Sequence, residues 1–190
     1  MRDLILKMSI SVDGFVSDLD GGNRWMFGAD PEAKTWSVAT LWTAGLHIMG
    51  RRTFGAMAGH WPTATDMFAP PMNDIPKAVF ARHDLKLPET PQQAGGDSWA
   101  DAYVARGHLA DEIAMLKAQP GKPIIAHGGV GFARSLVAHG LVDQFILLVI
   151  PVALGTGLPI FSDLAAPLRL RLIESKAFPG GAVAQTYRPA

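Results

Sequence analysis

The segment GKPIIAHGGVGFARSLVAHGLVDQFILLVIPVALGTGLPIF, residues 121–161, decides the fold class of this 190-residue chain. A short apolar strand runs into Gly128-Gly129-Val130-Gly131, a helical stretch follows, and a second apolar strand begins at Gln144. Strands that are apolar along their whole length are typical of parallel sheets covered by helices on both faces. A glycine pair between strand and helix lets backbone N–H groups approach a phosphate at the positive end of the helix dipole. The segment therefore indicates either a nucleotide site or a plain tight connection.

The order of strand, glycine and helix also occurs earlier in the chain. Residues 46–49 are predicted to form a strand that meets Gly50, where a second helix opens. Asp30 followed by Pro31 predicts the N-cap and first turn of another helix, which we expect to end at Gly45. The remaining elements predicted from apolar spacing are strands at 4–10, 77–81, 123–127 and 144–152, a helix with Leu109, Ile113 and Leu116, a surface excursion at 88–97, and a terminal hairpin of 168–172 with 182–187.

Alternation of strands and helices with an antiparallel ending predicts the fold class. We expect a single α/β domain over residues 1–190 with three layers, helix, sheet and helix, around a mixed, mostly parallel central sheet. In the hairpin, the strand at 168–172 alternates strictly, so one of its faces should be exposed to solvent. No strand opens into the glycine pattern of a Rossmann domain, so any dinucleotide would be bound in another way.

Composition and charge limit the classes of function. The chain has 17 lysine and arginine residues and 17 aspartate and glutamate residues, so no global field draws it to nucleic acid or to a membrane. It has no cysteine, which excludes thiolate metal sites and thiol catalysis and fits the cytoplasm as its compartment. The six histidines show no ligand spacing, so we predict no metal site. We expect no membrane span or nucleic-acid partner, and any recognition of phosphate must be local.

Several short motifs in the same order resemble one family. They are Ser11-Val12-Asp13-Gly14-Phe15, Met49-Gly50-Arg51-Arg52-Thr53-Phe54, His60-Trp61-Pro62, Ile75-Pro76-Lys77, Gly128-Gly129, and the run from Gly140 to Phe161. The chain resembles the dihydrofolate reductase-like superfamily, in the branch that contains the C-terminal reductase domain of the bacterial riboflavin-biosynthesis bifunctional protein. The resemblance implies NADPH across the carboxyl edge of the sheet and hydride transfer to a small heterocycle, as in 5-amino-6-(5-phosphoribosylamino)uracil reductase.

The resemblance also implies where the cofactor lies. Its adenine-side phosphates would meet a helix N-terminus formed by Gly50, Arg51, Arg52 and Thr53, with one of the two arginines near the 2′-phosphate. Arg82 would supply a second contact to that phosphate. Without the family, a solvated helix end with one surface cation is the favoured explanation of the arginine pair, and the alternative for Arg82 is a common surface arginine after a strand.

The same resemblance implies that two further segments bind the pyrophosphate and the nicotinamide of the cofactor. Gly128, Gly129, Val130 and Gly131 would bind the pyrophosphate through backbone N–H groups, and the superfamily suggests a cis peptide between the two adjacent glycines. The loop with Val12, Phe15 and Val16 would lie against the nicotinamide and shield it from water. For Phe15 the alternative is simple core packing.

The proton source and the substrate pocket have weaker candidates. Folate-reducing relatives carry a buried carboxylate on the first helix, where this chain offers Lys34 between Asp30 and Glu32. Asp30 and Asp13 are the candidate catalytic acids, although the first also fits an N-cap and the second also fits turn chemistry. Candidates to stack on a flat heterocycle, or else to pack in the core, are Trp25, Trp36, Phe54 and Trp61.

Two other functions and one assembly stay open at this point. One is true dihydrofolate reduction, and the other is a nucleotide-binding module without catalysis, which the missing helix carboxylate favours. The strand at 144–152 and the terminal hairpin also offer surfaces through which two copies would form a homodimer.

Overall fold

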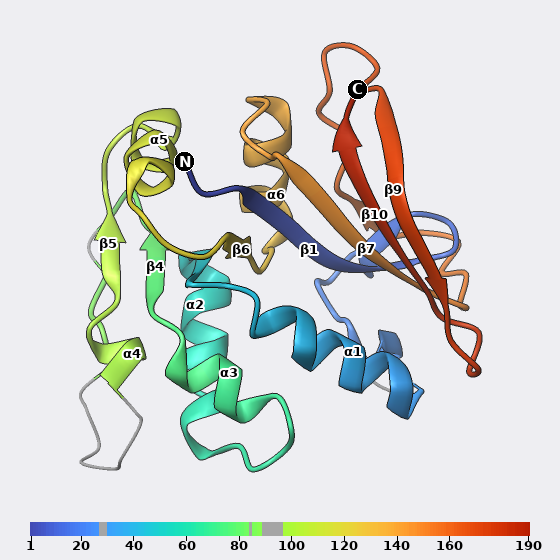
Figure 1. The fold of residues 1–190 in the computed structure, drawn as a ribbon, viewed down its shortest axis with the longest axis horizontal. Coiled ribbons are helices and arrows are strands. Elements are labelled where there is room, and N and C mark those ends of the chain that lie inside the picture. Colours follow the sequence, from blue (N-terminus) through green and yellow to red (C-terminus); the bar gives the residue numbers. More distant parts are fainter. Residues whose placement is uncertain (27–29, 84, 89–96) are drawn as a thin grey trace.

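One eight-stranded sheet runs through the computed structural model, which describes residues 1–26, 30–83, 85–88 and 97–190 (Figure 1). The strand order is β5-β4-β3-β6-β1-β7-β10-β9. All neighbouring pairs from β5 to β7 are parallel, whereas β10 is antiparallel both to β7 and to β9. The prediction of a mixed, mostly parallel sheet with an antiparallel terminal hairpin is confirmed.

The elements have the following bounds. The strands of the large sheet are β1 Leu4–Ser11, β3 Leu46–Gly50, β4 Lys77–Phe80, β5 Tyr103–Ala105, β6 Ile124–Ala126, β7 Gln144–Ile150, β9 Leu170–Ala177 and β10 Val183–Pro189. A small sheet joins β2 Phe15–Ser17 to β8 Leu158–Pro159. The helices are α1 Pro31–Leu41, α2 Arg51–Ala58, α3 Ala69–Asp74, α4 Asp97–Ala100, α5 Leu109–Ala118 and α6 Val130–Ala138, with 3₁₀ turns η1 Arg24–Met26 and η2 Trp61–Thr63.

Helices cover the central sheet on both faces, so the chain has three layers (Figure 1). α5 and α6 pack one apolar cluster against β1, β3, β6 and β7, with Leu6, Ile48 and Leu136 fully buried. α1, α2 and α3 cover the opposite face through three smaller clusters. The near-continuous apolar strands of the sequence are explained by this double coverage.

α1 begins where the sequence predicts and ends earlier. Asp30 is its N-cap, and the carboxylate accepts hydrogen bonds from the Glu32 and Ala33 amides at 2.7 and 3.3 Å. The helix stops at Leu41 instead of Gly45. The next amides, those of Thr43 and Ala44, bond to carbonyls three residues back and tighten the chain into a turn.

The terminal hairpin differs from its prediction in exposure. β9 starts at Leu170, and every residue from 171 to 177 is exposed, although one face was expected to be buried. The reason is its position, because β9 is the last strand and pairs only with β10. A register shift opposite Thr186 and Tyr187 bends the hairpin further. Leu172 and Ile173 remain 52% and 48% exposed.

Some elements were not foreseen, and one prediction lies outside the described residues. β5, α3 and the β2–β8 pair are short and carry too few residues to show a periodicity. The predicted surface excursion at 88–97 falls almost entirely on residues 89–96, which are outside the described ranges. In the part that is described, no helix has the length and apolar character needed to cross a bilayer.

Candidate active site

Two helix N-termini meet at the carboxyl edge of the sheet. β3 and β6 are adjacent and parallel, and each leads through glycine into a helix, α2 after Gly50 and α6 after Gly129. The helices approach so closely that a Cβ on Gly129 would lie 2.6 Å from Thr53 Oγ1. A Cβ on Gly50 would likewise lie 3.1 Å from the Phe132 Cβ. The glycines at these positions are therefore required by contact between α2 and α6.

The glycine pair before α6 turns the chain without a cis peptide. Gly128 and Gly129 both have positive φ, +57° and +65°, and the described chain contains no cis bond, so the expected cis peptide is wrong. Two successive left-handed glycines reverse the chain in the trans form, which other residues would adopt only with strain. The N-cap Gly129 has no side chain to accept from the first amides of α6. Those amides, with the helix dipole behind them, suit an anion.

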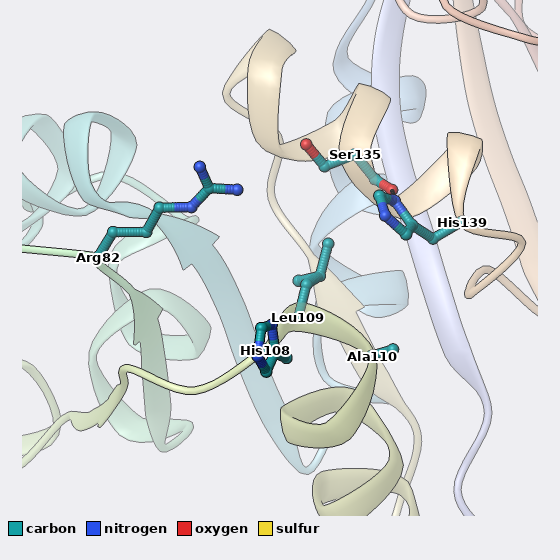
Figure 2. A pocket seen from close by; sticks show the side chains of 6 residues that line it. All are labelled: Arg82, His108, Leu109, Ala110, Ser135 and His139. Carbon is teal, nitrogen blue, oxygen red and sulfur yellow. Dashed lines mark hydrogen bonds between the residues drawn. The ribbon is translucent and has the colours of Figure 1, made fainter.

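A shallow pocket of about 250 Å³ lies beside α6 (Figure 2). It is lined by Arg82, His108, Leu109, Ala110, Ser135 and His139. Arg82 follows β4 and extends its guanidinium across the pocket mouth toward the α6 side (Figure 2). A ring nitrogen of His139 lies 2.8 Å from the Ser135 carbonyl, which fixes the imidazole on the pocket wall. Three separate segments thus place polar side chains around one opening.

The two predicted arginines of α2 occupy its first turn. Arg51 and Arg52 are both exposed, and Arg82 is exposed on the neighbouring strand end. The carboxyl edge therefore carries local positive charge although the formal net charge of the chain is zero. Such local charge is what phosphate recognition requires in a neutral protein.

Two loops, one after β1 and one after the neighbouring strand β7, are joined to each other. We call residues 11–17 and 152–159 the loop wall, because they join through Asp13 and through the β2–β8 pair. Val12 is 65% exposed on this wall, and Phe15 is partly buried. Val16 is 4% exposed and belongs to the core, so it has no surface left for a ligand.

The two candidate acids act as hydrogen-bond acceptors in the structure. A hydrogen bond from the Gly180 amide, with those from Glu32 and Ala33, holds the pKa of Asp30 below its ordinary value. Hydrogen bonds from Ser11 and from the Gly155 and Leu154 amides do the same to the pKa of Asp13. Both carboxylates are therefore ionised, and neither has a proton to give at neutral pH.

A row of basic side chains crosses the sheet on the α1 face, and the sequence analysis missed it. Lys7 on β1, His127 after β6, His47 on β3 and Lys77 on β4 come from four adjacent strands. The two imidazoles are in edge contact with centroids 4.3 Å apart, and Lys7 Nζ lies 5.9 Å from the Trp36 ring centroid. In the described part of the chain, neither His47 nitrogen nor His127 Nε2 has a hydrogen-bond partner.

Burial sets the protonation of this row. Desolvation lowers the pKa of Lys7 to about 8 and that of His127 to about 3. Burial also lowers the pKa of His47 well below its ordinary value, and the neighbouring His127 and Lys77 add to the effect. At neutral pH both histidines are neutral and Lys7 is a cation. A lone lysine within the predicted strand at 4–10 was the signal in the sequence, because lysine is rarely placed on a strand that helices cover on both faces.

The four candidate aromatic residues lie in two separate clusters. Trp25 and Trp36 pack on the cluster of Leu148 and Ile150, and the Trp36 ring centroid is 5.8 Å from that of Phe178. Phe54 and Trp61 belong to the cluster around β3 and β4 instead. Phe54 is 1% exposed and packs on Trp99, so it is a core residue without a free face. The structure therefore does not bring the four residues into one slot.

The family follows from comparison with known sequences. A model of the RibD C-terminal domain matches residues 2–184. The chain belongs to the RibD C-terminal domain family. This RibD-family chain is 30% identical to the Bacillus subtilis protein YwjB over 189 residues, which cover 98% of this chain and 97% of YwjB. The Bacillus subtilis protein YyaP is 26% identical to this chain over 186 residues, which cover 98% of this chain and 94% of YyaP. Both relatives are described as uncharacterized.

Solved structures show that this RibD-family chain has a dihydrofolate reductase-like fold. A protein of Shewanella sp. PV-4, provisionally named for riboflavin biosynthesis, superimposes with a TM-score of 0.75 at 23% identity, over 100% of this chain and 99% of that one. The Thermotoga maritima pyrimidine deaminase and 5-amino-6-(5-phosphoribosylamino)uracil reductase superimposes with a TM-score of 0.72 at 15% identity, over 100% of this chain and 57% of that one. Enterococcus faecalis dihydrofolate reductase complexed with NADP(H) superimposes with a TM-score of 0.63 at 14% identity, over 98% of this chain and 96% of that one. The predicted fold family is confirmed.

The described residues hold no grouping of three histidine, aspartate or glutamate side chains in reach of one metal ion. The basic row itself contains two lysines and no carboxylate, so it offers a metal ion no anionic ligand.

Proposed function

We propose that this protein is an NADPH-dependent reductase that transfers a hydride to a small heterocyclic substrate. The observation that carries the proposal is the meeting of the α2 and α6 N-termini around Gly129, at adjacent ends of parallel strands. Membership of the RibD C-terminal domain family and the fold shared with an NADP(H)-binding dihydrofolate reductase support it. NADPH supplies the hydride when it is bound, and the protein supplies binding, orientation and a proton.

The residues at the carboxyl edge fit the anionic half of that cofactor. Backbone amides at the start of α6 would bind the pyrophosphate, and Thr53 would flank it from α2. Arg82 would pair with the 2′-phosphate from the mouth of the pocket, together with Arg51 or Arg52. Val12, exposed on the loop wall, would contact the nicotinamide end and exclude water there.

Lys7 is the proton source that fits this site best. Its pKa of about 8 leaves the ammonium group charged at neutral pH, while His127 beside it is neutral. A group whose pKa lies near the working pH serves well as a general acid. Among the described residues of α1 the buried side chains are Ala33, Ser37 and Leu41, so no carboxylate faces the sheet where folate reductases carry theirs. Reduction of a pteridine-like or pyrimidine-linked ribosyl compound is therefore favoured over dihydrofolate reduction.

The cofactor assignment is tested by nucleotide titration. Quenching of tryptophan fluorescence is expected to show NADPH bound at least about tenfold more tightly than NADH, because the arginines recognise the 2′-phosphate. Arg82→Ala should weaken NADPH by about tenfold and leave NADH unchanged. Arg51→Ala and Arg52→Ala separate the two helix arginines, and Arg171→Ala on the exposed β9 strand is the matched control. Equal binding of both nucleotides by every variant would refute NADPH specificity, and no binding of either would refute the reductase.

Replacing Lys7 by methionine tests the proton source. NADPH oxidation with 5-amino-6-(5-phosphoribosylamino)uracil and with dihydrofolate as acceptors is expected to fall about a hundredfold or more, within the usual range for loss of a general acid. NADPH affinity should stay within about twofold, since Lys7 lies off the phosphate path. In the wild type, kcat should decline as pH rises through about 8, because Lys7 then loses its proton. A flat profile over that range would remove Lys7 from this role, and NADPH binding without turnover would favour a noncatalytic module.

A further inference from the structure

Asp13 connects the two halves of the loop wall. Its Oδ2 accepts hydrogen bonds from the Gly155 amide at 2.7 Å and the Leu154 amide at 3.0 Å, and Oδ1 lies 3.1 Å from the same Leu154 nitrogen. Ser11 Oγ donates to Oδ1 at 2.6 Å and accepts from the Phe15 amide at 3.0 Å. One carboxylate therefore joins the end of β1 to a turn that lies 141 residues further along the chain.

Other contacts align the same two loops and make them one unit. The Val12 amide donates to the Val152 carbonyl at 2.8 Å, and β2 pairs with β8. Gly157 approaches Phe15 so closely that a Cβ on the glycine would lie 2.9 Å from the Phe15 Cβ. These contacts fix the direction in which the wall runs, but only Asp13 binds the exposed turn at Leu154 and Gly155 among the hydrogen bonds found in the described chain.

The donors around Asp13 leave it no free proton to exchange with a substrate. Both oxygens act as acceptors for a hydroxyl and two backbone amides, which is the pattern of a fully ionised carboxylate. Charge-assisted hydrogen bonds of this kind are stronger than neutral ones and favour a single geometry. Beside it, Val12 presents a 65% exposed apolar side chain on the carboxyl edge. The arrangement is that of a support for an apolar contact surface.

We propose that Asp13 is a positioning residue that holds the loop carrying Val12 and Phe15 in place for the nicotinamide end of the cofactor. The inference depends on the proposed function, because it assigns the loop wall to one half of NADPH. It replaces the expectation that Asp13 acts as a catalytic acid. The adenine half, bound at Arg82 and α6, should be independent of Asp13.

Asp13→Asn is the variant that separates these roles. Asparagine has the same shape but no charge, and its NH₂ group, a donor, must face either the backbone amides of Leu154 and Gly155 or the Ser11 hydroxyl that now donates to Oδ1. The substitution therefore replaces charge-assisted hydrogen bonds by weaker neutral ones and weakens the connection, while it leaves the loop volume unchanged. The matched control is Asp18→Asn, because Asp18 accepts from the Asp20 and Gly22 amides at 3.0 and 2.6 Å within its own turn.

The experiment combines amide hydrogen exchange with two nucleotide titrations. In Asp13→Asn we expect exchange at Leu154 and Gly155 to accelerate about tenfold or more. NADPH should bind about tenfold more weakly, whereas 2′,5′-ADP, which has only the adenine half, should bind within about twofold of wild type. Asp18→Asn should change neither affinity. Ser11→Ala removes one donor and should give the same pattern with smaller amplitude, which keeps the test available if Asp13→Asn fails to fold.

The possible results decide the inference and the proposed function separately. Unchanged exchange at residues 154–155, or equal weakening of NADPH and 2′,5′-ADP, would overturn the positioning role. If wild-type protein binds neither nucleotide, the proposed function is overturned and the nicotinamide assignment with it, while the exchange data still report whether Asp13 holds the loops. Selective loss of NADPH with retained 2′,5′-ADP supports both.

Discussion

Gly129→Ala is expected to weaken NADPH binding by about a hundredfold or more and to lower the free energy of unfolding by roughly 2–5 kcal/mol. The residue has a φ of +65°, and a Cβ there would lie 2.6 Å from Thr53 Oγ1. The left-handed conformation costs an alanine about 1–2 kcal/mol, and overpacking adds a further 1–3 kcal/mol. To relieve the contact, either the Thr53 side chain must rotate or α2 and α6 must separate, and each change disturbs groups that would bind or flank the pyrophosphate.

Gly140→Ala is the matched control for that prediction. Gly140 has nearly the same φ, +64°, but no atom lies within 4 Å of its added Cβ, and it follows the other end of α6. The Gly140→Ala variant should lose about 1–2 kcal/mol of its free energy of unfolding, the cost of the left-handed backbone alone, and should bind NADPH as tightly as the wild type. Urea unfolding and fluorescence titration of both variants give the comparison. Normal NADPH binding by Gly129→Ala would refute the anion site between the two helices.

Lys77→Met is expected to stabilise the protein near neutral pH by about 2–4 kcal/mol. Lys77 is 2% exposed, and burial lowers its pKa to about 7, against an opposing effect of Asp74. Holding such a lysine costs roughly 5 kcal/mol at pH values below its folded pKa, by the size of the shift. Part of the gain is lost because the Ile75 carbonyl and Ser98 Oγ lose their hydrogen-bond partner, at about 1–3 kcal/mol.

The pH dependence of that stabilisation has a definite sign. Between the folded pKa of about 7 and the ordinary lysine pKa of 10.5, unfolded chains hold a proton on Lys77 that folded chains lack. The free energy of unfolding of the wild type therefore rises with pH across that window because of Lys77. The difference by which Lys77→Met is more stable than the wild type shrinks over the same range. Urea unfolding at several pH values from 6 to 10 measures it, with the exposed Lys122→Met as control. A methionine advantage that does not change with pH would contradict the buried-lysine explanation.

The fold was largely accessible from sequence because its signals are local. Apolar runs, the Asp30-Pro31 helix start and the glycines after β3 and β6 each report on their own neighbourhood, and the structure confirms them. The end of α1 was misplaced because Gly45 is not a helix cap. Its amide donates to the Pro123 carbonyl, and a Cβ would press on Lys122, so its reason is tertiary contact.

The candidate site was only partly accessible because its partners are distant in sequence. The role of Asp13 depends on Leu154 and Gly155, and no residue near position 13 in the sequence predicts these contacts. Lys7 and His47 become neighbours of His127 only through the strand order β3-β6-β1. Phe54 and Trp61 were grouped with Trp25 and Trp36 because aromatic identity was visible in the sequence, whereas the sheet that places them in separate clusters was not.

The place of β1 in the sheet also decides when this protein can fold during its synthesis. Leu4 pairs with Ile124 and Ile5 with Gln144, so both neighbours of the first strand are translated late. A nascent chain that has reached α5 holds an apolar strand with two unpaired edges, which is prone to aggregation. Folding must wait for β6 and β7 to leave the ribosome, and the many distant pairings make it slow. Chaperones that bind extended apolar segments will therefore meet residues 4–11 first and release them last.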